Sequence, residues 1–89
     1  MDKPRRKAEA LTTEQKRKEK EIFKKRLANV IKKARTSRGY KQEDVASLAG
    51  LDLSYIGHLE RGVYIPTSYV LWKIAKALEI KLSTLVRDL

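Results

Sequence analysis

Apolar residues recur along the chain at the three- and four-residue spacing of helices, and no stretch alternates with the two-residue period of a strand. The first stripe of this kind comprises Ile22, Phe23, Leu27, Val30, Ile31 and Ala34. It predicts a long first helix with one buried face. Thr12 or Thr13 is a candidate for its N-cap, and Gly39 is a candidate for its C-cap.

Four shorter helices are predicted after this one. Their expected ranges are 41–49, 53–61, 69–79 and a short stretch from Ser83. Gly50 separates the first two, and Asp52 is a candidate N-cap for the second. Thr67 or Ser68 is the candidate cap of the third. The pattern therefore predicts an all-α domain of five helices.

Charge is distributed unevenly. Lysine and arginine number 21 against 11 aspartate and glutamate, for a formal net charge of +10. Residues 1–41 hold 16 of these basic residues and 5 acidic ones, whereas residues 42–89 hold 5 and 6. A regional excess of this size points to an anionic partner, foremost nucleic acid. We expect residues 1–21 to form a basic arm and helix extension, and residues 22–89 to form the domain.

Several classes of function are disfavoured by composition. The chain has no cysteine, one histidine, no glycine-rich phosphate loop and no carboxylate pair in a plausible cleft. We therefore expect no enzymatic activity, no metal, no cofactor and no small-molecule substrate. No apolar run approaches the roughly 18 residues of a membrane span, and no secretory signal is present, so a cytoplasmic, nucleoid-associated protein without a membrane partner is expected.

Residues 39–62 carry the most informative motif, which is two short helices separated by a tight turn at Gly50. This arrangement exposes the N-terminal part of the second helix, so that it can enter the major groove of DNA. The first helix then lies across the groove and can direct its N-terminal amides at a phosphate.

The segment resembles the Xre/Cro/phage-repressor family of helix-turn-helix DNA-binding proteins. The matching residues are Gln42, Glu43, Val45, Ala46, Gly50, Ser54, Tyr55, Ile56, the run Leu59–Gly62, Pro66 and the run Ile74–Leu78. The resemblance covers about residues 22–89. It implies a five-helix lambda-repressor-like fold and a transcription regulator, expected to be a repressor. The expected active form is a homodimer on a palindromic operator in double-stranded DNA.

The resemblance also implies roles for particular residues. Those expected to contact base edges are Leu53, Ser54 and His58. Those expected to contact the DNA backbone are Gln42, Lys41, Arg38, Tyr55, Arg61, Tyr64, Thr67 and Ser68. Arg35 and Glu60 match a structural ion pair of the family. The candidate dimer interface comprises Leu82, Leu85, Val86 and Leu89.

Some positions depart from the family pattern. Leu53 and Ser54 stand where long polar residues are common, although Leu53 can meet a thymine methyl group and Ser54 can hydrogen-bond most bases. Specificity is therefore expected to rest on few contacts and on DNA shape. Gly57 costs a helix about 1 kcal/mol relative to alanine, and it allows close approach of DNA or of a neighbouring side chain. Tyr69 and Trp72 fit either the core or an interface.

Two other functions remain open. Bridging coactivators and antitoxins resemble this chain in joining such a domain to a basic extension, so residues 1–21 are the functional part of a protein-interaction adaptor in the second hypothesis. The cations at 3–7 and 16–26 either bind DNA or are solvated charge. An RNA-binding role ranks lower, because the aromatic sheet and glycine loop of common RNA modules are absent from the pattern.

Overall fold

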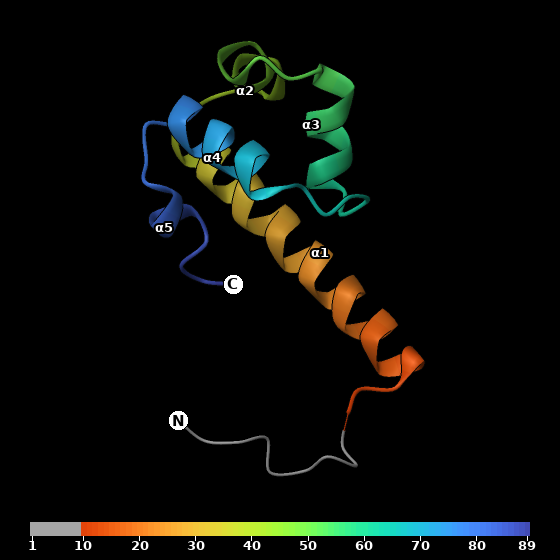
Figure 1. The fold of residues 1–89 in the computed structure, drawn as a ribbon. Helices are drawn as coiled ribbons and strands as arrows, with labels where there is room; N and C mark the ends of the chain where they lie inside the picture. Colours follow the sequence, from red (N-terminus) through yellow and green to blue (C-terminus); the bar gives the residue numbers. More distant parts are fainter. Residues whose placement is uncertain (1–9) are drawn as a thin grey trace.

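The computed structural model describes residues 10–89, which form five helices and no strand. The helices are α1 (Thr13–Ser37), α2 (Gln42–Ala49), α3 (Leu53–Glu60), α4 (Ser68–Ala77) and α5 (Leu82–Leu85). The shorter helices gather around the C-terminal half of α1 (Figure 1). The predicted all-α, five-helix fold is confirmed. The cations expected in an arm at residues 3–7 lie outside the described residues.

α1 begins at Thr13 because Thr12 caps its first turn. The hydroxyl oxygen of Thr12 accepts from the backbone N–H of Gln15 at 3.1 Å, and the side-chain oxygen of Gln15 accepts from the N–H of Thr12 at 2.9 Å. This reciprocal pair satisfies amides that would otherwise lack a partner. The first turns of α1 project beyond the other helices (Figure 1). The expected boundary between residues 1–21 and 22–89 therefore falls within an unbroken helix.

The apolar stripe of α1 faces the core, with one exception. Leu27 and Ile31 are 2% and 1% exposed, and Phe23 and Val30 pack against the core from its edge. Ile22 is 54% exposed, so the prediction that it lies on the buried face was wrong. Nine residues separate Ile22 from Ile31, which is about two and a half helical turns, and Ile22 therefore lies on the opposite side of the helix.

The core joins all five helices. Its most deeply buried large side chains are Leu27, Ile31, Val45, Ile56, Leu59, Ile74 and Leu78. α3 packs on α1 and α2, and α5 packs on α4 and α1. None of the helices within residues 10–89 is long and apolar enough to cross a membrane.

Two glycines set the path of the chain around α3. Gly50 ends α2 in the left-handed conformation, with φ of 68°, and turns the chain into α3. Gly62 follows α3 with φ of 73°, and a Cβ atom there would lie 3.5 Å from the carbonyl oxygen of Lys24 in α1. That distance is an ordinary van der Waals contact, so glycine is favoured at this position by its left-handed backbone conformation and not by lack of space.

The helix caps agree with the sequence in part. The hydroxyl oxygen of Thr67 caps α4 by accepting from the N–H of Val70 at 3.2 Å. Asp52 stands at the N-cap of α3, but its side chain forms no capping hydrogen bond. The C-cap of α1 is Arg38, one residue before the predicted Gly39.

Candidate nucleic-acid interface

The first turn of α3 presents its outer face to solvent. Leu53 is 50% exposed and Ser54 is exposed, whereas Ile56 and Leu59 are 0% and 2% exposed. Leu53 also lies beside the start of α2, where it lines one shallow hollow with Lys41 and Gln42. Residues expected to contact bases and residues expected to contact the backbone therefore share one surface.

α3 is held in place by the carboxylate of Glu60, its last residue. Arg35 of α1 donates to the two oxygens of Glu60 from Nε and Nη2, at 2.7 and 2.9 Å. Gln42 of α2 donates to Oε1 of Glu60 from Nε2 at 3.0 Å. Arg35 also donates from Nη1 to the carbonyl oxygen of Tyr40 at 2.8 Å. One carboxylate thus joins α3 to both α1 and α2, and the ion pair expected from the sequence is present.

Both partners of this pair are largely removed from water. The side chains of Glu60 and Arg35 are 3% and 11% exposed. Burial by itself would raise the pKa of Glu60, but hydrogen bonds from Arg35 and Gln42, together with the charge of Arg35, outweigh it and lower that pKa. The hydrogen bond to Glu60 in turn raises the pKa of Arg35. The pair is therefore fully charged at neutral pH.

Gln42 has a structural contact that the sequence did not reveal. The resemblance placed its amide on a phosphate, and here one amide N–H donates to Glu60. The amide nitrogen carries two hydrogens, so one donor remains for another acceptor. Only the fold could reveal this contact, because 18 residues separate Gln42 from Glu60 in the chain.

Gly57 makes room for Arg61. A Cβ atom at Gly57 would lie 3.1 Å from Nη1 of Arg61 and 3.7 Å from Oε1 of Gln42. The guanidinium group of Arg61 therefore lies against the bare backbone of α3, beside the amide of Gln42. Of the two uses left open for this glycine, the structure contains the close approach of a neighbouring side chain.

Three of the expected contact residues form an aromatic cluster. The rings of Tyr55 and Tyr64 stack with centroids 5.7 Å apart, and the ring of His58 lies 5.4 Å from that of Tyr64. Burial, and then the neighbouring phenol of Tyr64, raise the pKa of Tyr55, so its hydroxyl stays protonated at neutral pH and can donate. The stack fixes the loop after α3 against the helix. The sequence identified these residues but not their mutual contact.

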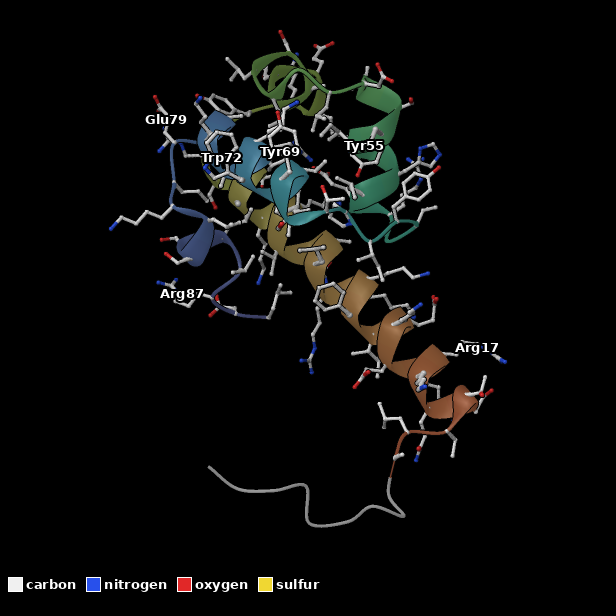
Figure 2. The ribbon with its side chains drawn as sticks, viewed as in Figure 1. Arg17, Tyr55, Tyr69, Trp72, Glu79 and Arg87 are labelled. Atoms are coloured by element: carbon white, nitrogen blue, oxygen red, sulfur yellow. The ribbon has the colours of Figure 1, made fainter. Side chains whose placement is uncertain are left out.

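The remaining backbone-contact candidates divide into two groups. Thr67 and Ser68 are exposed at the start of α4, where the first-turn amides have no partner within the helix. Arg38 instead donates to the carboxylate of Glu79, at the other end of α4 (Figure 2). Thr67 and Ser68 are therefore accessible at the start of α4, whereas Arg38 is turned toward the C-terminal end of α4.

The residues expected in a dimer interface differ in exposure. Leu85 is 3% exposed and belongs to the core of its own chain, so its side chain is not available to a partner. The cause is the packing of α5 on α4 and α1. Leu82, Val86 and Leu89 are half-buried at the edge of this core and retain some exposed surface.

Comparison with known proteins agrees with this geometry. A helix-turn-helix family model (HTH_3) matches residues 31–85. The HTH-type transcriptional regulator SutR of Escherichia coli is 33% identical over 60 residues, which are 67% of this chain and 34% of that protein. The chain thus spans about a third of SutR's length.

Solved structures give the same result. The restriction-modification controller protein C.AhdI of Aeromonas hydrophila superposes with a TM-score of 0.70 at 34% identity, covering 72% of this chain and 97% of that one. An HTH_3 family transcriptional regulator of Vibrio cholerae superposes with a TM-score of 0.73 at 38% identity, covering 78% and 39%. Residues 31–85, which the family model matches, include α2, α3 and the turn between them. This chain therefore belongs to the helix-turn-helix family of the Xre/Cro type.

Proposed function

We propose that this protein is a DNA-binding transcription regulator that represses from a palindromic operator as a homodimer. The observation that carries the proposal is the exposed first turn of α3, held in a fixed orientation by the contacts of Glu60 with α1 and α2. A rigidly held, solvent-facing helix start is what insertion into the major groove requires. Membership of the helix-turn-helix family supports the same function.

In this proposal α3 reads the bases. The methyl groups of Leu53 suit the methyl group of a thymine, the hydroxyl of Ser54 suits several base edges, and His58 lies one turn further along the same helix. The starts of α2 and α4 grip phosphates on either side of the groove through their free amides. The phenol groups of Tyr55 and Tyr64 add hydrogen bonds to the backbone.

A single recognition helix covers few base pairs, and a symmetric dimer doubles the site. Two copies place their α3 helices in successive major grooves about 34–36 Å apart. We place the contact between copies at Leu82, Val86 and Leu89, because these apolar side chains keep exposed surface at one end of the domain. The proposed setting is the cytoplasm, and the proposed role is binding without catalysis.

The test is selection of bound sequences from a random duplex pool at two salt concentrations. The full chain is expected to enrich a palindrome whose half-sites are one helical turn apart. Ser54→Ala is expected to relax the selection at the base pair that the hydroxyl contacts, because alanine cannot hydrogen-bond to a base edge. Ser83→Ala, which removes an exposed hydroxyl from α5, is the matched control and should select the same sequence as the unmodified chain.

The second candidate function is an adaptor that uses the N-terminal extension. The projection of the start of α1 from the body of the domain favours it (Figure 1). It predicts that no sequence is enriched, and that duplex binding disappears with added salt or with removal of residues 1–21. Retention of the same palindrome by the truncated chain would contradict it.

A further inference from the structure

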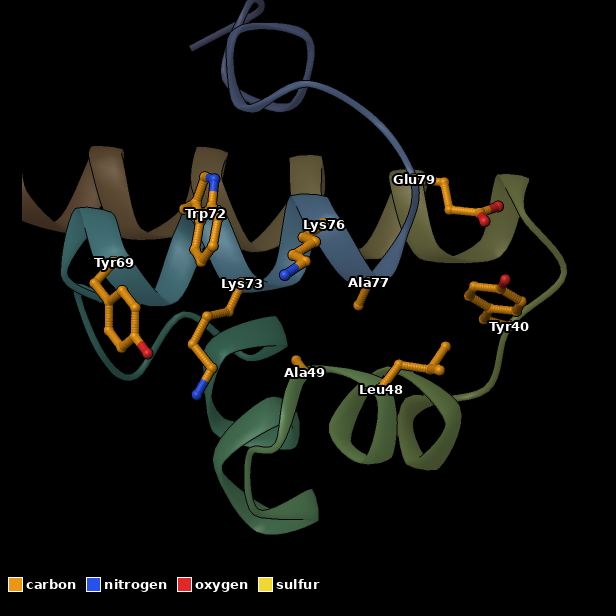
Figure 3. Close-up of a pocket in the computed structure, with 9 residues that line it drawn as sticks. All are labelled: Tyr40, Leu48, Ala49, Tyr69, Trp72, Lys73, Lys76, Ala77 and Glu79. Atoms are coloured by element: carbon orange, nitrogen blue, oxygen red, sulfur yellow. The ribbon is translucent and has the colours of Figure 1, made fainter.

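A groove between α2 and α4 stands outside the proposed DNA contacts (Figure 3). It has a volume of about 420 Å³. Leu48 of α2 is 61% exposed there, and Tyr69 and Trp72 of α4 are 63% and 48% exposed. We propose that this groove docks an acidic, leucine-rich segment of a partner protein.

The aromatic residues of the groove are not part of the core. Tyr69 and Trp72 stack on each other with centroids 6.1 Å apart and planes inclined by 19°. Neither belongs to the buried cluster, which contains their neighbours Ile74, Ala75 and Leu78. The stack orders two large side chains before any partner arrives, so docking loses little of their conformational freedom.

Two lysine side chains line the groove and make it positively charged. The ammonium group of Lys73 lies 5.2 Å from the ring centre of Tyr69, and that of Lys76 lies 5.1 Å from the ring centre of Trp72. Among residues 10–89, neither ammonium group lies within 4.0 Å of a carboxylate. Glu79, at the end of the groove, is already paired with Arg38. The groove therefore offers positive charge without an internal counterion.

The free polar groups of the groove also suit carboxylates. The indole N–H of Trp72 and the ammonium groups of Lys73 and Lys76 are donors only, and the Tyr69 hydroxyl can donate as well. A nucleobase would need open ring faces, but the stacking and the two ammonium groups already use faces of both rings. Carboxylates accept from these donors, while leucine side chains cover Leu48 and the ring edges. These features favour an acidic protein segment over a nucleic acid.

The groove and the proposed DNA contacts lie mostly on different parts of α2 and α4, and they adjoin at Tyr69, which follows Ser68. The groove lies at the C-terminal half of α2, on the side of α4 that carries Lys76 and Ala77. The proposed DNA contacts lie at the starts of α2, α3 and α4. No residue of α3 lines the groove, so a partner in the groove leaves the proposed base-reading helix uncovered. The inference does not depend on the operator.

The experiment uses the full chain and a synthetic peptide as the probe. The peptide is an amphipathic helix with leucine on one face and glutamate on the other, and its control carries glutamine in place of glutamate. Trp72 is the only tryptophan of the chain, so its fluorescence reports directly on the groove. We expect a saturable change in emission with the glutamate peptide, and binding roughly tenfold weaker with the glutamine peptide.

Variants locate the binding. Lys76→Glu is expected to lower the affinity for the glutamate peptide roughly tenfold, since it reverses one of the two positive charges of the groove. Leu48→Ser should weaken it through loss of apolar contact. Lys81→Glu, an equal charge reversal at an exposed position outside the groove, should leave the affinity unchanged. All three substituted residues are exposed, so circular dichroism should find each variant folded.

Several results would overturn the inference. One is equal affinity for the glutamate and glutamine peptides. Another is a loss of peptide affinity in Lys81→Glu as large as that in Lys76→Glu. A third is displacement of the peptide from the groove by duplex or single-stranded DNA. A change of oligomeric state in Leu48→Ser would assign the groove to a second copy instead. Duplex binding measured beside these titrations keeps the two proposals apart, because its loss would contradict the regulator and leave the peptide result standing.

Discussion

The side chain of Glu60 holds the recognition surface without belonging to it. Its two oxygens receive hydrogen bonds from Arg35 of α1 and Gln42 of α2. A buried ion pair contributes little net stability compared with apolar residues, but removing one partner leaves the other charge uncompensated. The fold should therefore tolerate replacement of Glu60 and Arg35 together by apolar residues better than replacement of either one alone.

Glu60→Gln is expected to lower the free energy of unfolding by about 3 kcal/mol, the lower end of the range for breaking a buried pair. Urea denaturation followed by circular dichroism measures it. Glu21→Gln is the matched control, since Glu21 forms an exposed pair with Lys24 at 2.8 Å. It should have little effect. Equal destabilisation by both substitutions would contradict the structural role of Glu60.

The same carboxylate predicts a dependence on pH. Because the pKa of Glu60 is lowered in the folded chain, its stabilising contribution is complete above the unfolded pKa of about 4.3. The contribution disappears as pH falls through the lowered, folded pKa. The difference in stability between the unmodified chain and Glu60→Gln should therefore be constant near neutral pH and shrink in acid. A difference that grew in acid would refute the direction of the shift.

Two glycines of the α3 region should respond oppositely to alanine. Gly57→Ala is expected to stabilise the fold by up to about 1 kcal/mol, since Gly57 is helical and the atom that a Cβ meets is the mobile end of Arg61. Gly62→Ala is expected to destabilise it by about 1–2 kcal/mol, because its φ of 73° is left-handed. Thermal unfolding of the two variants side by side gives the comparison, and the same sign for both would contradict it.

At the scale of elements, α1 and α4 have similar threonine N-caps but differ in how firmly their first turns are packed on the core. Thr12 and Thr67 each accept from the backbone N–H three residues ahead. The first turns of α1 bury no side chain, whereas α4 buries Ile74 and Ala75. Loss of a cap should therefore stay local in α1 and reach the whole fold in α4.

Thr67→Ala is expected to lower the free energy of unfolding by about 1 kcal/mol. Thr12→Ala should leave the global unfolding midpoint unchanged and speed amide hydrogen exchange in the first turns of α1. Denaturation and hydrogen exchange measured on both variants give the comparison. A global loss of stability from Thr12→Ala would show that the projecting turns contribute to the cooperative fold.

The helices could be predicted from the sequence because apolar spacing, caps and turn glycines all depend on residues that are near one another in the chain. Apolar spacing placed the helices, and Gly50 marked the turn between α2 and α3. Contacts between distant residues were not available from spacing, which is why the bond from Gln42 to Glu60 and the pairing of Arg38 with Glu79 were missed. Leu85 was misplaced because a leucine on a short helix looks the same whether it faces a core or a partner.

At the scale of the whole molecule, the basic residues of α1 extend the positive surface past the compact domain. Arg17 projects from the start of α1, away from the other helices (Figure 2). Whether such charges touch phosphates or are only solvated decides how salt acts on DNA affinity, because each phosphate contact adds about 0.9 to the slope of log affinity against log salt.

We expect the double variant Lys16→Gln, Lys20→Gln to weaken binding to operator and random duplexes alike, and to make the slope less steep by up to about 1.8. Fluorescence anisotropy over a salt series measures it. Lys81→Gln with Arg87→Gln removes the same charge from the C-terminal part and should have a smaller effect. Equal effects of the two double variants would mean that only net charge matters.

The way α3 is held on the domain has a consequence for how such a protein can acquire a new DNA sequence preference. Glu60, Ile56 and Leu59 hold the helix on the domain, and Leu53 and Ser54 face outward. The two sets share a helix but no residue. The outward-facing residues can therefore be varied in combinatorial libraries to obtain new operator preferences while the buried contacts of α3 are kept. The DNA sequence preference and the stability of the fold can thus change independently of each other.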